Sequence, residues 1–74
     1  MPKPLRDQII ELGGAYTITR LLDPNHLHLV VVDTKQRMTV LDMMGKTTEL
    51  DLMLERAIRI LEVNRGQDSD TEAG

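Results

Sequence analysis

The start of the chain carries apolar residues at helical spacing. Leu5, Ile9 and Leu12 recur three or four positions apart after Pro4, a residue suited to the first turn of a helix. Two consecutive glycines then follow and break the pattern. We therefore expect a short helix over about residues 4–12.

A longer apolar stripe near the other end predicts a second, amphipathic helix. Its members recur with a period of 3.6 residues, and they are Leu50, Met53, Leu54, Ala57, Ile58 and Leu61. We expect Thr47 or Thr48 to cap this helix. Asn64-Arg65-Gly66 is a typical signal for its end.

Between the two helices, three runs of β-branched and aliphatic residues predict strands at about 16–22, 26–32 and 37–43. Asp23-Pro24-Asn25 favours a type I turn between the first two runs. The second run, HLHLVVV, is apolar on both faces, which is typical of a central strand.

The third run predicts that Met38 and Val40 share one face of its strand, and that Thr39 and Leu41 share the other. Gly45 is expected to break this strand. The three runs and their two short turns together favour a three-stranded antiparallel meander.

The order of these elements predicts an α+β fold, αβββα, with a short N-terminal helix and a long C-terminal amphipathic helix packed on the meander. We expect residues 1–66 to form one small domain. Residues 67–74, QDSDTEAG, are expected to be a disordered acidic tail.

Composition adds an expectation of self-association. The chain has 74 residues, no Phe, Trp or Cys, one Tyr and five Met. Domains of this size bury only about 60% of their unfolded surface and often need disulfides, metals or oligomerisation. Without Cys, a homodimer is the expected solution. No signal peptide or membrane-length apolar run is apparent, so we expect a cytoplasmic protein.

The charge pattern gives weak support to nucleic-acid binding. The net charge is −3, but Asp68, Asp70 and Glu72 lie in the tail and the body up to residue 65 is neutral. A neutral body lacks the long-range attraction for phosphates that supplies most non-specific affinity. Nucleic-acid regulation is therefore the alternative function, through Lys35, Arg37 and Lys46 if they cluster at one end of the sheet.

Catalytic and metal-binding patterns are incomplete. The segment VLDMMGKT, residues 40–47, ends like a phosphate-binding loop but lacks its first glycine. His26 and His28 share a strand face, yet two ligands do not make a metal site, although a site shared across a dimer stays open. No hydroxyl has a recognisable activating base. We expect no catalytic residue, metal or cofactor.

Protein binding is the function that remains. The meander leaves two edge strands that can accept another strand, and methionine side chains adapt to varied partners. The candidate interface residues are Met38, Val40, Met43, Met44, Leu52, Ile60 and Val63. We expect a homodimeric adaptor or inhibitor that binds a larger protein, of a kind found in bacteria and their mobile elements.

Overall fold

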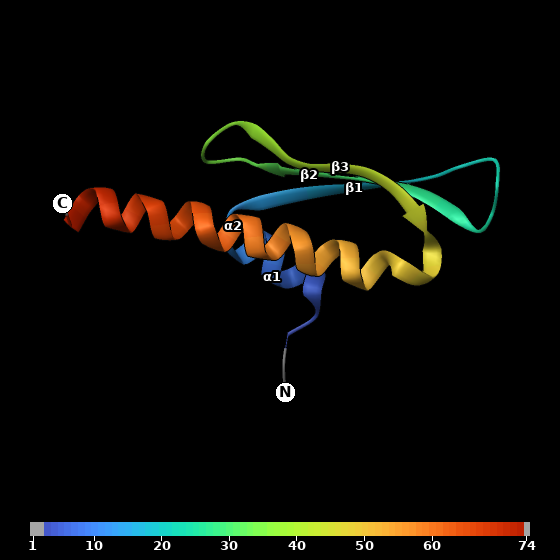
Figure 1. Cartoon of the computed structure of the whole chain (residues 1–74), viewed down its shortest axis with the longest axis horizontal. Coiled ribbons are helices and arrows are strands. Elements are labelled where there is room, and N and C mark those ends of the chain that lie inside the picture. Colours follow the sequence, from blue (N-terminus) through green and yellow to red (C-terminus); the bar gives the residue numbers. More distant parts are fainter. Residues whose placement is uncertain (1–2, 74) are drawn as a thin grey trace.

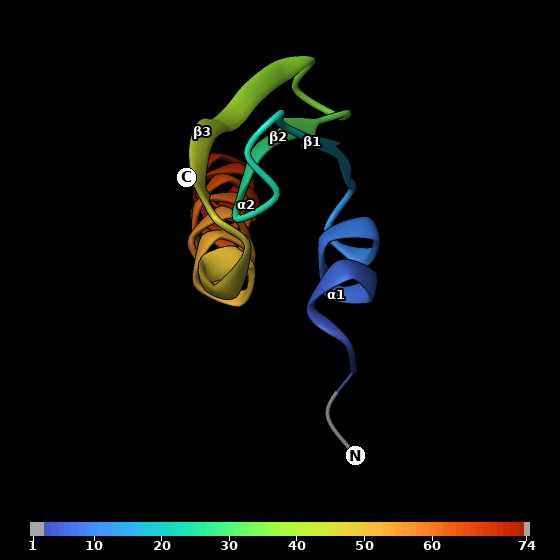
Figure 2. The same cartoon turned by 90° about the vertical axis from the view of Figure 1, so that its right-hand side faces the viewer.

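Both helices lie on one face of a three-stranded sheet, so the structure has two layers (Figures 1 and 2). The computed structural model describes residues 3–73, and the side chains of residues 3–66. The elements in chain order are α1 (Leu5–Glu11), β1 (Gly14–Arg20), β2 (His26–Asp33), β3 (Met38–Lys46), the 3-10 helix η1 (Thr47–Glu49) and α2 (Leu50–Ala73). The predicted αβββα order is confirmed.

The sheet is the predicted antiparallel meander. Its spatial order is β1-β2-β3, which makes β2 the central strand and leaves β1 and β3 as edges. At the β1–β2 turn, the N–H of His26 donates to the C=O of Asp23 at 3.1 Å. The predicted turn at Asp23-Pro24-Asn25 is therefore confirmed.

The alternation of β2 supplies the centre of the core. Leu27, Leu29 and Val31 face the helices and are buried, whereas His26, His28, Val30 and Val32 lie on the opposite, outer face and are half-buried. The predicted helix stripe covers the inner face, and the buried core consists of Ile9, Leu27, Leu29, Val31, Met53, Leu54, Ala57, Ile58 and Leu61. Helices cover only the inner face of β2, and its half-buried outer face carries no helix (Figure 2).

β1 begins and ends two residues earlier than predicted. Gly13 has a φ of 87°, a left-handed conformation that glycine adopts easily. The chain therefore turns directly after α1, and pairing starts at Gly14 opposite Asp33. A Cβ at Gly14 would lie 2.9 Å from side-chain carbons of both Ile9 and Leu61. This glycine allows α1 and α2 to pack closely against the first residue of the strand.

β3 is longer than predicted, because Gly45 does not end it. The pairing continues through Gly45 opposite Leu27 to Lys46 opposite His26. Glycine is accommodated because Met53 approaches the strand here: a Cβ at residue 45 would lie 3.0 Å from the Met53 sulfur. Gly45 therefore serves the packing of α2 against β3.

A β-bulge in β3 corrects the predicted faces. Val31 pairs with Leu41, but Val32 pairs with Thr39, so Val40 is the extra residue. Leu41 lies on the inner face with Val31, and Thr39 lies on the outer face with Val32. The prediction that Thr39 and Leu41 share a face is wrong, because a bulge resets the alternation.

Both ends of α2 differ from the prediction. At its start, the carboxylate of Glu49 accepts the backbone N–H of Lys46 at 3.3 Å. This contact, and not the predicted threonine cap, stabilises the turn that leads into α2. At its other end, α2 passes through Gly66 and continues to Ala73. Gly66 is not among the described residues with positive φ, so it lacks the conformation with which glycine ends a helix.

The predicted acidic tail, residues 67–74, has its side chains outside the described residues, and its disorder stays a prediction. Within the described part of the chain, no helix is both long enough and apolar enough to cross a membrane.

Candidate functional site

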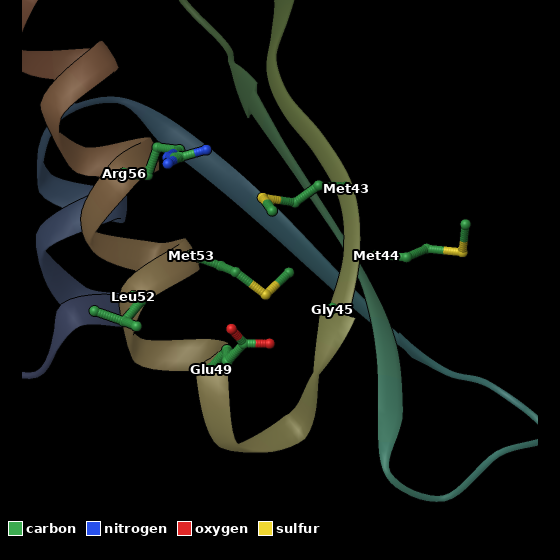
Figure 3. Close-up of a pocket in the computed structure, with 7 residues that line it drawn as sticks. All are labelled: Met43, Met44, Gly45, Glu49, Leu52, Met53 and Arg56. Atoms are coloured by element: carbon green, nitrogen blue, oxygen red, sulfur yellow. The ribbon is translucent and has the colours of Figure 1, made fainter.

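The open edge of the sheet at β3 and the adjacent flank of α2 border a hollow of about 200 Å³. We call it the edge hollow, and its lining residues are Met43, Met44, Gly45, Glu49, Leu52, Met53 and Arg56. In Figure 3, Met43 and Met53 point into the space between strand and helix, and Met44 points to the opposite side of β3. Glu49 and Arg56 stand at opposite ends of this space.

Two exposed apolar side chains border the edge hollow. The Met44 and Leu52 side chains are 67% and 65% exposed, although both are large and apolar. Met43 is half-buried and packs against the core, and Met53 is buried within it. The hollow therefore has adaptable thioether walls and an acidic and a basic side chain at its rim.

The structure brings together three of the seven predicted interface residues, namely Met43, Met44 and Leu52. Val40 lies in the bulge and packs against the core. Met38 is 47% exposed at the far end of β3, opposite Asp33. Ile60 and Val63 lie two and three helical turns beyond Leu52 on α2, so they extend the same side of the helix.

Four lining residues of the edge hollow were not predicted as site residues. Gly45 had been interpreted only as a strand breaker, and Met53 as core. Glu49 and Arg56 are ordinary charged residues in the sequence, and their positions at the rim depend on the packing of α2 against β3. A glycine beside two methionines is the one signal in the sequence that could have indicated a hollow.

The three predicted nucleic-acid contacts do not cluster. Lys35 lies in the β2–β3 turn and Arg37, with a φ of 54°, lies at the end of that turn. Lys46 ends β3 at the opposite end of the strand, where it pairs with His26. The predicted basic cluster is therefore not formed, because a nine-residue strand separates its members.

His26 and His28 share the outer face of β2, as predicted, and each contacts a carboxylate. His26 Nδ1 lies 3.0 Å from Asp23 Oδ2, and His28 Nε2 lies 2.5 Å from Asp42 Oδ1. The backbone N–H of Asn25, together with His26, lowers the pKa of Asp23. Among the described residues, no group of three or more His, Cys, Asp or Glu side chains is placed to hold a metal ion.

Asp33 forms a buried polar cluster at the end of the molecule that carries the β2–β3 turn. Its carboxylate accepts the backbone N–H groups of Lys35 and Gln36 at 3.0 and 3.1 Å. It also accepts the side-chain amide of Asn64 at 3.2 Å and forms an ion pair with Arg65. The cluster therefore joins the turn to α2.

The environment of Asp33 holds its carboxylate in the charged form. Burial on its own raises the pKa of this carboxyl, but hydrogen bonds from Arg65, Gln36 and Asn64, together with the charge of Arg65, outweigh burial and lower the pKa below its ordinary value. Groups from the β2–β3 turn and from α2 satisfy the Asp33 carboxylate, so folding explains the cluster and we do not assign it to ligand binding.

Comparisons of this chain with models of known protein families, with curated protein sequences and with solved structures return no match.

Proposed function

We propose that this protein is a small non-enzymatic protein-interaction module, a homodimeric adaptor or inhibitor that binds a larger protein. The observation that carries the proposal is the exposure of Met44 and Leu52 around a hollow beside an edge strand. Edge strands offer backbone donors and acceptors to a partner, and adjacent apolar surface supplies affinity and selectivity.

The β3 side of the molecule supports this proposal better than the β1 side. The large apolar side chains that are exposed within the described residues include two on β3, namely Met38 and Met44, and two on α2, namely Leu52 and Val63. The others are Ile10 on α1 and Leu22 in the β1–β2 turn, and none lies on β1 itself. A partner that covers β3 would therefore remove apolar surface from water, and that burial favours association.

We also propose that this module works in the cytoplasm. The chain contains no cysteine, so it needs no oxidising environment to fold.

A capture experiment with two matched variants tests the proposed interface. Extract from the native host is passed over immobilised wild-type protein, Leu52→Glu and Leu22→Glu, and retained proteins are identified by mass spectrometry. Leu22 is fully exposed in the β1–β2 turn and does not line the edge hollow, so its variant controls for loss of an exposed leucine.

We expect one larger protein to be retained by wild type and by Leu22→Glu, and to be lost with Leu52→Glu. Equal retention by all three would place the binding surface elsewhere. Turnover of a small compound by the purified chain would overturn the non-enzymatic assignment.

A further inference from the structure

The backbone groups of β3 that face away from the sheet can be identified from one hydrogen bond. The N–H of Thr47 donates to the C=O of Asn25 on the β2 side at 2.9 Å. Because successive residues of an extended strand present their N–H and C=O to opposite sides, Met43 and Gly45 also face β2. Asp42, Met44 and Lys46 therefore face the open edge, where Glu49 accepts the N–H of Lys46.

The charges of β3 are complementary to those of an antiparallel copy of the same strand. Asp42 and Lys46 are its charged residues, and both lie on the outer face with Met44 midway between them. When two copies pair with Met44 opposite Met44, each Asp42 meets the partner's Lys46. A register centred on Asp42 instead places two carboxylates opposite each other, which is unfavourable.

The register centred on Met44 also fits the backbone. In an antiparallel ladder, a residue that faces the partner strand exchanges both its hydrogen bonds with the residue opposite. Asp42, Met44 and Lys46 all face the open edge, so the central pair exchanges both its hydrogen bonds. In each charged pair the N–H of Asp42 donates to the C=O of Lys46 in the other copy, because the N–H of Lys46 is already donated to Glu49. The backbone permits this register, and the charges distinguish it from the register centred on Asp42, which has the same hydrogen-bond pattern.

The α2 flank repeats this self-complementarity. Glu49 and Arg56 stand at opposite ends of the edge hollow, and Met53 lies between them (Figure 3). A two-fold axis that passes through the hollow therefore brings Glu49 of one copy toward Arg56 of the other.

We infer that a second copy of this chain occupies the edge hollow, with β3 paired to β3 in the antiparallel register centred on Met44. The result is a continuous six-stranded sheet whose α2 helices lie side by side on one face. This inference rests on the proposed function, because it names the partner and the geometry of the homodimer. Isologous interfaces of this kind need only one self-complementary patch.

Single-cysteine variants test the register directly, since the natural chain contains no cysteine. In a hydrogen-bonded antiparallel pair the Cα atoms are about 5.5 Å apart, which a disulfide can span. We compare Met44→Cys with Asp42→Cys, which lies two residues from the axis, and with Leu22→Cys, whose position in the β1–β2 turn is fully exposed. Circular dichroism verifies that each reduced variant is folded.

Under mild oxidation we expect Met44→Cys to form a covalent dimer about tenfold faster than Leu22→Cys, because the interface raises the local thiol concentration. Asp42→Cys is expected to remain close to the Leu22→Cys rate. Faster cross-linking at residue 42 than at residue 44, or equal rates at 44 and 22, would overturn the register.

A charge exchange provides a second readout by analytical ultracentrifugation. Lys46→Asp is expected to raise the dimer dissociation constant about tenfold, since it opposes like charges across the strands. Adding Asp42→Lys to the same chain should restore the dimer. Lys35→Asp, the same charge change in the β2–β3 turn, serves as the control. Failure of the double variant to restore the dimer would contradict the assigned pairs.

The outcomes separate this inference from the proposed function. A wild-type dimer without the Met44 cross-link overturns the register and leaves the homodimeric module in place. A wild-type protein that light scattering shows to be monomeric at micromolar concentration overturns the inference and the homodimer together. Binding of a larger protein is decided by the capture experiment in either case.

Discussion

Asp33 shows how one side chain can tie distant parts of a small domain together. Among the described side chains it is the polar or charged one that is fully buried, and its partners come from the β2–β3 turn and from α2. Thr34, its neighbour, reaches the C=O of Gly13 through both its backbone N–H and its hydroxyl. Three chain segments therefore meet around two adjacent residues.

Replacing Asp33 by Asn should destabilise the protein substantially. The substitution removes the negative charge and leaves Arg65, whose side chain is only 19% exposed, without its buried counter-charge. Breaking a buried ion pair from one side costs about 3 kcal/mol or more. Urea unfolding of wild type, Asp33→Asn and the exposed control Asp7→Asn measures this loss. A difference below about 0.5 kcal/mol, the range of ordinary surface substitutions, would contradict the stabilising role of the pair.

The Asp33 carboxyl should also make stability depend on pH in the acid range. Its pKa is lowered on folding from an ordinary value of 3.8, so protons bind the unfolded chain more readily than the folded one. The stabilisation is therefore complete above about pH 5 and is lost as pH falls through the folded-state pKa.

The free energies of unfolding of wild type and Asp33→Asn, measured from pH 3 to 7, test this expectation. The gap between them should be largest above about pH 5 and should narrow toward pH 3. A gap that stays constant over this range would show that the carboxylate charge does not contribute.

The direction of Asp33 was predictable, but its partners were not. Strict alternation along β2 places residue 33 on the face opposite the two histidines, as the structure confirms. Asn64 and Arg65 lie 31 and 32 residues later, and in the sequence they are typical of a helix end. Their role depends on how far α2 extends along the sheet, which periodicity does not specify.

At the scale of elements, interior segments were predicted well and boundaries were not. The α2 stripe and the β2 alternation each bury a continuous face, so pattern alone is decisive there. Gly45 and Gly66 were both interpreted as breakers, yet each continues its element. Glycine allows a helix or strand to end but does not require it to end. At residue 45, the close packing of Met53 explains why a glycine lies inside β3.

Gly66→Ala distinguishes a helix that continues from a helix that ends. In a continuous helix, alanine is favoured over glycine by up to about 1 kcal/mol, and no neighbouring atom lies within 4 Å of the added Cβ. We therefore expect a higher melting temperature. A helix that ends with left-handed glycine at this position would instead lose stability on the same substitution. Differential scanning calorimetry gives the sign.

At the scale of the whole molecule, the distribution of charge separates the proposed function from its alternative. The body is neutral, and Lys46 lies at the opposite end of β3 from Lys35 and Arg37. These three residues therefore do not form one basic surface that could bind a phosphate backbone. The candidate interface, in contrast, combines surfaces from β3, η1 and α2 that only the folded chain brings together.

Fluorescence titration of generic DNA and RNA at low salt tests this distinction. We expect no binding at micromolar protein, because non-specific affinity comes from neutralised phosphates. The variant Lys35→Asp/Arg37→Asp should behave like wild type. Tight binding that falls steeply with added salt and disappears in this variant would favour the nucleic-acid regulator.

The late position of α2 in the chain has a consequence for synthesis. Once residues up to 49 have left the ribosome, all three strands of the sheet are outside it. About half of the core side chains, from Met53 to Leu61, have then not yet emerged. Leu27, Leu29 and Val31 then face water on a strand that the nascent chain cannot yet cover. We expect the polypeptide to stay unfolded, and open to chaperones, until the segment of α2 up to Leu61 has left the exit tunnel.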